Sequence, residues 1–151
     1  MAAAIVGLYE SQATSKSILT KNEAVLYQNK ASDAWAYYQA KSVKEGMYSI
    51  SAKTSPANSR DFNNEAGRYN SEKKEIQKTA EDLEKKVESS NKESEKYFEK
   101  HHIFSFSETF LHIAIALAAI SALTRNRAFW GISILLSLIG VIIFIFGLAI
   151  A

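Results

Sequence analysis

The sequence predicts an all-α membrane protein, in which a long antiparallel, coiled-coil-like helical hairpin is followed by a C-terminal two-helix transmembrane hairpin. Three observations lead to this prediction. Two apolar runs of membrane-spanning length occupy the last third of the 151 residues, a heptad-like repeat occupies the middle, and the single proline separates two helical stretches of nearly equal length. We therefore divide the chain into residues 1–9, 10–102 and 103–151.

The composition excludes several classes of function. The chain has no Cys, which excludes disulfide frameworks, iron–sulfur clusters and thiolate zinc sites. The net charge is only +2 and Lys alternates with Glu, so there is no basic stripe for nucleic acid. The sequence contains no Gly-rich phosphate loop, nucleophile elbow or metal-spaced cluster. We therefore predict no enzymatic activity, no cofactor and no bound metal.

Residues 103–123 and 129–151 are predicted to span a bilayer. Each run is mostly apolar and has about the 20 residues that a helix needs to cross roughly 30 Å of hydrocarbon. Between them, residues 124–128 form a short basic turn, and Phe129 and Trp130 follow where aromatic anchors belong. A soluble helical core is the alternative, but a chain of this length cannot bury two helices that are apolar on all sides.

Small residues predict that the two spans pack together, because they let helix backbones approach closely in lipid. The same ridges could instead face a partner protein. One ridge lies on each span: Ala114, Ala118 and Ala122 on the first, and Ser133, Gly140 and Gly147 on the second.

Glu108 and His112 are the ionisable residues within the first span. They are four residues apart and therefore share a helix face. Because charge in hydrocarbon is unfavourable, such residues usually face protein or water. One interpretation is a proton or ion relay, or a polar contact with a partner helix. In the other, Glu108 reaches the membrane surface and His112 forms a hydrogen bond between helices.

Residues 10–102 are predicted to form a soluble helical hairpin with helices at about 11–53 and 61–100 and a tip at 54–60. Pro56 disfavours helix in the residue before it. Folding there would place Trp35 opposite Ile76 and Ala80. The second helix shows a 4-3 repeat, which predicts a coiled-coil-like contact line: Phe62, Ala66, Tyr69, Lys73, Ile76, Ala80, Leu83, Val87, Ser90, Ser94 and Tyr97.

The first helix offers two candidate contact faces. Its main 4-3 frame contains Leu19, Leu26, Ala36, Ala40, Val43, Met47 and Ile50, and its second face contains Ala24, Ala31, Trp35 and Tyr38. The cluster of Trp35, Tyr37, Tyr38 and Gln39 is interpreted as hairpin core, with a docking surface or a ligand site as alternatives. Residues 1–9 are too short to span and are expected at the membrane, as an interfacial foot or the end of a spanning helix whose beginning is missing.

The run NKASDAWAYYQAKS at residues 29–42 resembles the signature of a bacterial membrane family known as domain of unknown function 4337. Residues 111–117 and 123–130 are also similar to that family, so the resemblance covers the chain from about residue 20. It implies an N-terminal spanning helix, a helical soluble segment and a C-terminal membrane hairpin. The chain departs from this pattern at its start, where only residues 1–9 stand in place of the first span. The resemblance brings no activity, substrate or catalytic residues.

We therefore expect a non-enzymatic, membrane-anchored scaffold or interaction protein, either an accessory subunit or an oligomeric component of a larger membrane complex. Its partners would be the lipid bilayer and other membrane subunits or copies of itself. The alternative is a channel or transporter component that uses Glu108 and His112. Two arginines in the 124–128 turn favour a cytoplasmic turn and a periplasmic hairpin at the bacterial inner membrane, while the Lys-rich run before His101 argues the other way.

Overall fold

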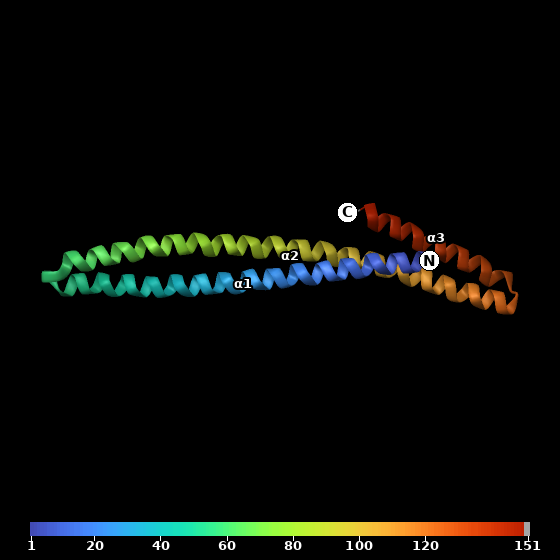
Figure 1. Cartoon of the computed structure of the whole chain (residues 1–151), viewed down its shortest axis with the longest axis horizontal. Coiled ribbons are helices and arrows are strands. Elements are labelled where there is room, and N and C mark those ends of the chain that lie inside the picture. The colour runs from blue at the N-terminus through green and yellow to red at the C-terminus, as the bar shows by residue number, and fades with distance from the viewer. Residues whose placement is uncertain (150–151) are drawn as a thin grey trace. The chain divides into compact units, whose positions relative to one another are not determined.

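The computed structural model describes residues 1–149, and these residues form three α-helices with no strand among them (Figure 1). The helices are α1 (Ala2–Thr54), α2 (Ser59–Thr124) and α3 (Arg127–Ala149), and a short 3-10 helix, η1 (Pro56–Asn58), joins α1 to α2. The all-α prediction is confirmed. Residues 150 and 151, the end of the second predicted span, lie outside the described residues.

The helices are longer than the sequence analysis expected. Residues 2–9 belong to α1, which was expected to begin near residue 11. The stretches predicted as 61–100 and 103–123 form the single helix α2. No Pro or Gly occurs between residues 68 and 130, so nothing in the backbone interrupts the helix where the polar composition changes to apolar.

The α1–α2 connection follows the backbone preferences of proline. Ser55, which precedes Pro56, has φ −129° and ψ 83°, outside the helical region that a following proline disfavours. Pro56 then starts η1, a position where its missing N–H costs nothing. The Asn58 N–H donates to the Ser55 carbonyl and closes the turn.

The α2–α3 connection is tighter than the predicted 124–128 turn. α2 ends at Thr124 and α3 begins at Arg127, so that Arg125 and Asn126 make the turn. Arg125 adopts φ 52°, the left-handed conformation that often ends a helix. The Ala128 N–H donates to the Asn126 side-chain oxygen at 2.9 Å, which caps the start of α3.

The described chain divides into two compact units. The first contains residues 1–20 and the described residues from 92 onward, and the second contains residues 21–91. In the first unit, the start of α1 packs on the apolar part of α2 and on α3. Its core consists of Ala3, Val6, Ala13, Phe104 and Leu111, with Phe144 packed against them.

In the second unit, α1 and α2 form an antiparallel pair. Lys21 donates to Asn91 at 2.8 Å, Trp35 Nε1 donates to Glu84 at 2.8 Å, and Lys41 pairs with Glu72. The Trp35 partner lies one helical turn beyond Ala80, the position expected from folding the sequence at its proline.

All members of the predicted 4-3 line on α2 are buried or half-buried. On α1, however, the main predicted frame is wrong. Leu26, Val43 and Met47 are 50%, 62% and 63% exposed, whereas Ala24 and Ala31 of the second face are buried. The reason is volume: small side chains are buried on both helices, including Ala24 and Ala31 on α1 and Ala80 on α2, and they let the two helices approach closely.

Candidate functional site

The ridge of small residues on α3 lies against α2. Ser133, Gly140 and Gly147 are buried in α3. The Ser107 hydroxyl donates to the Gly140 carbonyl at 2.8 Å, and the Ser133 hydroxyl donates to the Ala114 carbonyl at 2.9 Å. Side-chain hydroxyls thus bond to the backbone of the opposite helix, an arrangement that satisfies polar groups in an apolar setting.

The contact face of α2 differs from the predicted Ala114, Ala118 and Ala122 ridge. Ala114 is buried, but Ala118 and Ala122 are exposed. The buried line instead runs through Phe104, Ser107, Leu111, Ala114 and Ser121. Steps of four residues drift around a helix, and this drift carries Ala122 off the contact line. Ala118 keeps the three-four spacing but is exposed because it lines a pocket with Ala114, Ser133 and Ser137.

The remaining faces of these two segments are apolar and uncovered. α2 and α3 each contain a stretch long and apolar enough to cross a membrane, and only 22% and 17% of these stretches are buried. Exposed side chains include Ile115, Leu135, Leu138, Ile142 and Phe146. A helix in the core of a soluble protein would bury most of such a surface.

Between α1 and α2 in the first unit lies a group of four polar side chains, Glu10, Thr14, His101 and Glu108, which we call the polar cluster. His101 Nδ1 lies 2.9 Å from the Thr14 hydroxyl and 3.4 Å from Glu10 Oε1. The Glu108 carboxyl group lies beside Gly7 of α1, one helical turn before Glu10.

Glu108 faces α1 and is 22% exposed. A Cβ on Gly7 would lie 2.8 Å from Glu108 Oε1, so the glycine makes room for the carboxyl group. His112 is 62% exposed, 4.0 Å from Glu108 on its own helix, and forms no hydrogen bond between described helices. The expected interhelical hydrogen bond of His112 is thus not found among the described residues, where most of its side chain is exposed.

Glu10 and His101 were not predicted from the sequence as members of this cluster. The available signal was spacing: His101 and Glu108 are seven residues apart and share a helix face. Pairing α1 with α2 antiparallel about Pro56 would have brought Glu10 to that face. Among residues 1–149, no group of three acidic or histidine side chains is arranged to hold a metal ion.

The aromatic cluster of the second unit is split between two environments. Trp35 and Tyr38 are half-buried and stack edge to face, with ring centroids 5.5 Å apart. Tyr37 is 54% exposed and lies under the Lys41 ammonium, 5.0 Å from the ring centroid. Gln39 is exposed. Trp35 and Tyr38 thus belong to the α1–α2 contact, while Tyr37 and Gln39 do not.

Two ion pairs cross between the helices beside these rings, Lys41–Glu72 and Lys73–Glu45. The hydrogen bond from Lys41 lowers the pKa of Glu72 below its ordinary value and raises the pKa of Lys41. The hydrogen bond to Glu45 likewise raises the pKa of Lys73. Each ion pair therefore stabilises the charged form of the groups whose pKa it shifts.

The side of α1 away from α2 carries a row of large apolar side chains, which we call the outer stripe. Its members are all at least half exposed: Val25, Leu26, Val43, Met47 and Ile50. No described residue of the second unit covers them. The outer stripe thus has two parts, residues 25–26 and 43–50, with Asn29 and Asp33 between them, and the predicted main frame of α1 does not contact α2.

Comparison with known proteins gives one match. The family described as Domain of unknown function (DUF4337) matches residues 1–150. The match begins at residue 1, whereas the resemblance read from the sequence began near residue 20. No curated protein and no solved structure matches the chain.

Proposed function

The chain belongs to the DUF4337 family, and we propose that it is a non-enzymatic, membrane-anchored interaction protein. In this proposal the apolar part of α2, together with α3, is the anchor. The outer stripe of α1 is the surface that contacts another membrane subunit or a second copy of the chain. The single observation that carries the proposal is the exposure of that stripe.

The uncovered apolar faces of α2 and α3 support the anchor. Each exposed Leu or Ile keeps apolar surface in contact with water, which is unfavourable by a free energy of about 25 cal/mol per Å². This unfavourable term is removed when the side chain lies in lipid. The hydroxyl-to-carbonyl bonds of Ser107 and Ser133 also suit a water-free setting, since they leave neither hydroxyl unsatisfied. Arg125 and Arg127 support a cytoplasmic turn in a bacterial inner membrane.

The proposed orientation is tested with single cysteines, because the chain has none of its own. Asn58→Cys lies in η1 and Ala128→Cys lies at the exposed start of α3. In cells whose outer membrane is removed, an impermeant thiol reagent should label Asn58→Cys and leave Ala128→Cys unlabelled. The opposite pattern would reverse the orientation, and labelling of both would contradict two spans.

The exposed outer stripe supports an interaction role because a two-helix pair usually buries its largest aliphatic residues. Here the contact with α2 uses Ala24 and Ala31, while Val43, Met47 and Ile50 are all more than 60% exposed. Apolar residues at this helical spacing are typical of a face that docks on another helix. The half-exposed Tyr37 adds an aromatic residue of the kind enriched in interfaces.

The interaction role is tested by measuring the mass of the full chain purified in mild detergent or in lipid nanodiscs. The variant Val43→Ser/Met47→Ser/Ile50→Ser should lose the oligomer or the co-purifying subunit while α-helicity is retained. The matched control replaces three exposed residues of α2, Lys74→Ser/Glu75→Ser/Lys78→Ser, and should keep the assembly. A monomeric wild-type chain without any co-purifying subunit would overturn this role.

A proton or ion channel component is a second candidate, and the grouping of Glu10, His101 and Glu108 between α1 and α2 favours it. Together with His101 and His112, these carboxyls provide several protonatable groups on neighbouring turns. Two spans do not enclose a path by themselves, so this role needs an oligomer. Proton flux into liposomes that is lost in Glu108→Gln and in His112→Ala would support it, and absence of flux would exclude it.

A further inference from the structure

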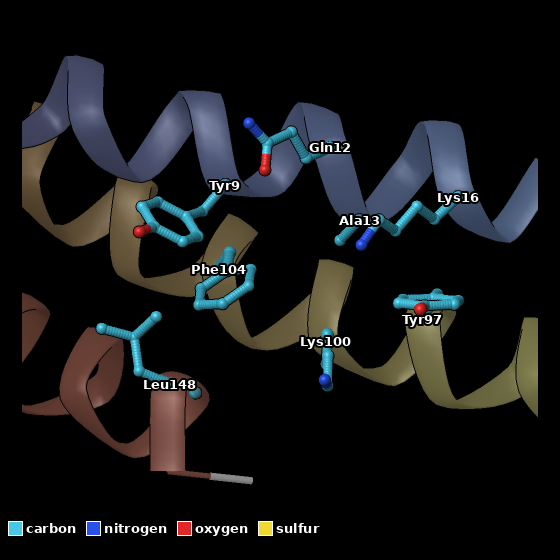
Figure 2. A pocket seen from close by; sticks show the side chains of 9 residues that line it. Tyr9, Gln12, Ala13, Lys16, Tyr97, Lys100, Phe104 and Leu148 are labelled. Carbon is cyan, nitrogen blue, oxygen red and sulfur yellow. The ribbon is translucent and has the colours of Figure 1, made fainter. Parts of the chain in front are cut away.

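The first unit contains a cavity that combines cationic, aromatic and apolar side chains from all three helices. It has a volume of about 160 Å³ and is lined by Tyr9 and Lys16 of α1, Tyr97, Lys100 and Phe104 of α2, and Leu148 of α3, among others. Figure 2 shows Tyr9, Phe104 and Leu148 gathered on one side and Lys16, Tyr97 and Lys100 on the other. The cavity thus has an apolar side and a cationic side.

The cationic side is built around one ring. The Lys16 ammonium lies 5.3 Å from the centroid of the Tyr97 ring, and the Lys100 ammonium lies 5.7 Å from the same centroid. Neither ammonium forms an ion pair with any of the described residues. Two like charges on one aromatic ring repel each other, so an anion bound between them would stabilise the arrangement.

The place of the cavity along α2 indicates what kind of anion it takes. Tyr97 and Lys100 end the polar stretch of α2, and Phe104 lies at the start of its apolar stretch. Leu148 comes from the end of the apolar α3. A bilayer that holds the apolar stretches has its headgroup layer at this level, where Tyr and Lys side chains are enriched.

We propose that this cavity binds the phosphate group of an anionic phospholipid, with Lys16 and Lys100 as its cationic ligands and Phe104 and Leu148 in contact with the lipid's apolar portion. The inference rests on the membrane anchoring proposed above. The shared chemistry is a phosphate ester, which a soluble metabolite could also supply. The apolar side of the cavity favours the lipid, because a soluble phosphate ester leaves Phe104 and Leu148 uncovered.

The test uses the full chain in nanodiscs of phosphatidylcholine, with or without phosphatidylglycerol, and counts retained lipids by native mass spectrometry. Lys16→Gln/Lys100→Gln should weaken retention of phosphatidylglycerol roughly 30-fold. The control Lys78→Gln/Lys96→Gln removes the same charge from exposed lysines outside the cavity and should retain the lipid. Lys16→Arg/Lys100→Arg should restore binding, which separates loss of charge from loss of folding.

Equal retention by the cavity variant and the control would overturn the proposal. Glycerol phosphate is added to the chain in neutral nanodiscs as a soluble competitor. If the chain retains it as well as it retains phosphatidylglycerol, and if Lys16→Gln/Lys100→Gln abolishes this retention, the ligand is a soluble phosphate ester and the assignment of a lipid is wrong. Failure of the chain to enter neutral nanodiscs would contradict the membrane anchoring itself, independently of this site.

Discussion

The Ser107 hydroxyl of α2 donates a 2.8 Å hydrogen bond to the Gly140 carbonyl of α3, and a Cβ on Gly140 would lie only 3.2 Å from the Ser107 carbonyl oxygen. The same Cβ would lie 3.0 Å from Leu111 Cγ. A side chain at position 140 would therefore crowd both the Ser107 backbone and Leu111, and glycine gives this hydrogen bond the room it needs. The small volume of Gly140 and the hydrogen bond from Ser107 together hold α3 against α2 at this point.

Gly140→Ala should destabilise the α2–α3 contact by about 1–3 kcal/mol, because the added methyl group meets a backbone oxygen that cannot move aside. Gly131→Ala is the matched control, since a Cβ there has no atom within 4 Å. Unfolding of the reconstituted chain in increasing SDS measures both variants. Equal midpoints for the two variants would contradict the packing described here.

A disulfide should form in the variant Ser17→Cys/Ser94→Cys. The two hydroxyl oxygens are 3.2 Å apart across α1 and α2, and the chain contains no other Cys to compete. Under mild oxidation the variant should migrate faster on a non-reducing gel. Ser15→Cys/Ser94→Cys is the control, because Ser15 is exposed and should not react within the chain. If a disulfide formed efficiently in Ser15→Cys/Ser94→Cys but not in Ser17→Cys/Ser94→Cys, the pairing of α1 with α2 described here would be wrong.

The stability of the α1–α2 pair should fall in acid, and part of the fall should come from Glu72. Its pKa is lowered in the folded chain by Lys41, so its contribution is complete above its ordinary pKa and is lost as the pH falls through the lowered value. The stability difference between wild type and Glu72→Gln should thus be constant near neutral pH, begin to shrink as the pH falls through the ordinary range of a glutamate, and vanish below the lowered pKa.

Thermal melts followed by circular dichroism at a series of pH values measure this difference. Glu75→Gln is the control, because it removes the same charge from an exposed side chain one turn along α2. Its difference from wild type should change little with pH. Since Glu72 is partly exposed, added salt should also reduce the effect of Glu72→Gln.

Asn126→Ala should weaken the start of α3 by about 1 kcal/mol, because the Ala128 N–H loses its side-chain acceptor. Asn126→Asp keeps an acceptor oxygen at the same position and should remain close to wild type. Amide hydrogen exchange over residues 127–130 measures the effect directly. Unchanged exchange in Asn126→Ala would show that the cap contributes nothing.

Much of the fold could be predicted because it depends on local features. The two apolar stretches, the break at Pro56 and the 4-3 line from Phe62 to Tyr97 are each visible within a short window of sequence. The α3 ridge of Ser133, Gly140 and Gly147 was also visible, since seven-residue spacing keeps its members on one face.

The candidate sites were harder to predict because they join distant segments. Glu10 looks like an ordinary surface residue until α1 lies against α2 and brings it to Glu108 and His101. Lys16 and Lys100 are 84 residues apart, and only their shared neighbour Tyr97 makes them a pair. No periodicity within one helix contains this information.

By itself the sequence determined that the chain is helical, where it turns and which stretches are apolar enough for lipid. The tertiary structure decided which of two possible α1 faces meets α2, and it chose the face with Ala24 and Ala31 over the one with Val43 and Met47. Hydrophobic periodicity cannot make that choice, because it counts apolar residues without their volumes. Small buried side chains on both helices, such as Ala31 and Ala80, let the backbones approach closely, and the larger aliphatic side chains of α1 remain exposed.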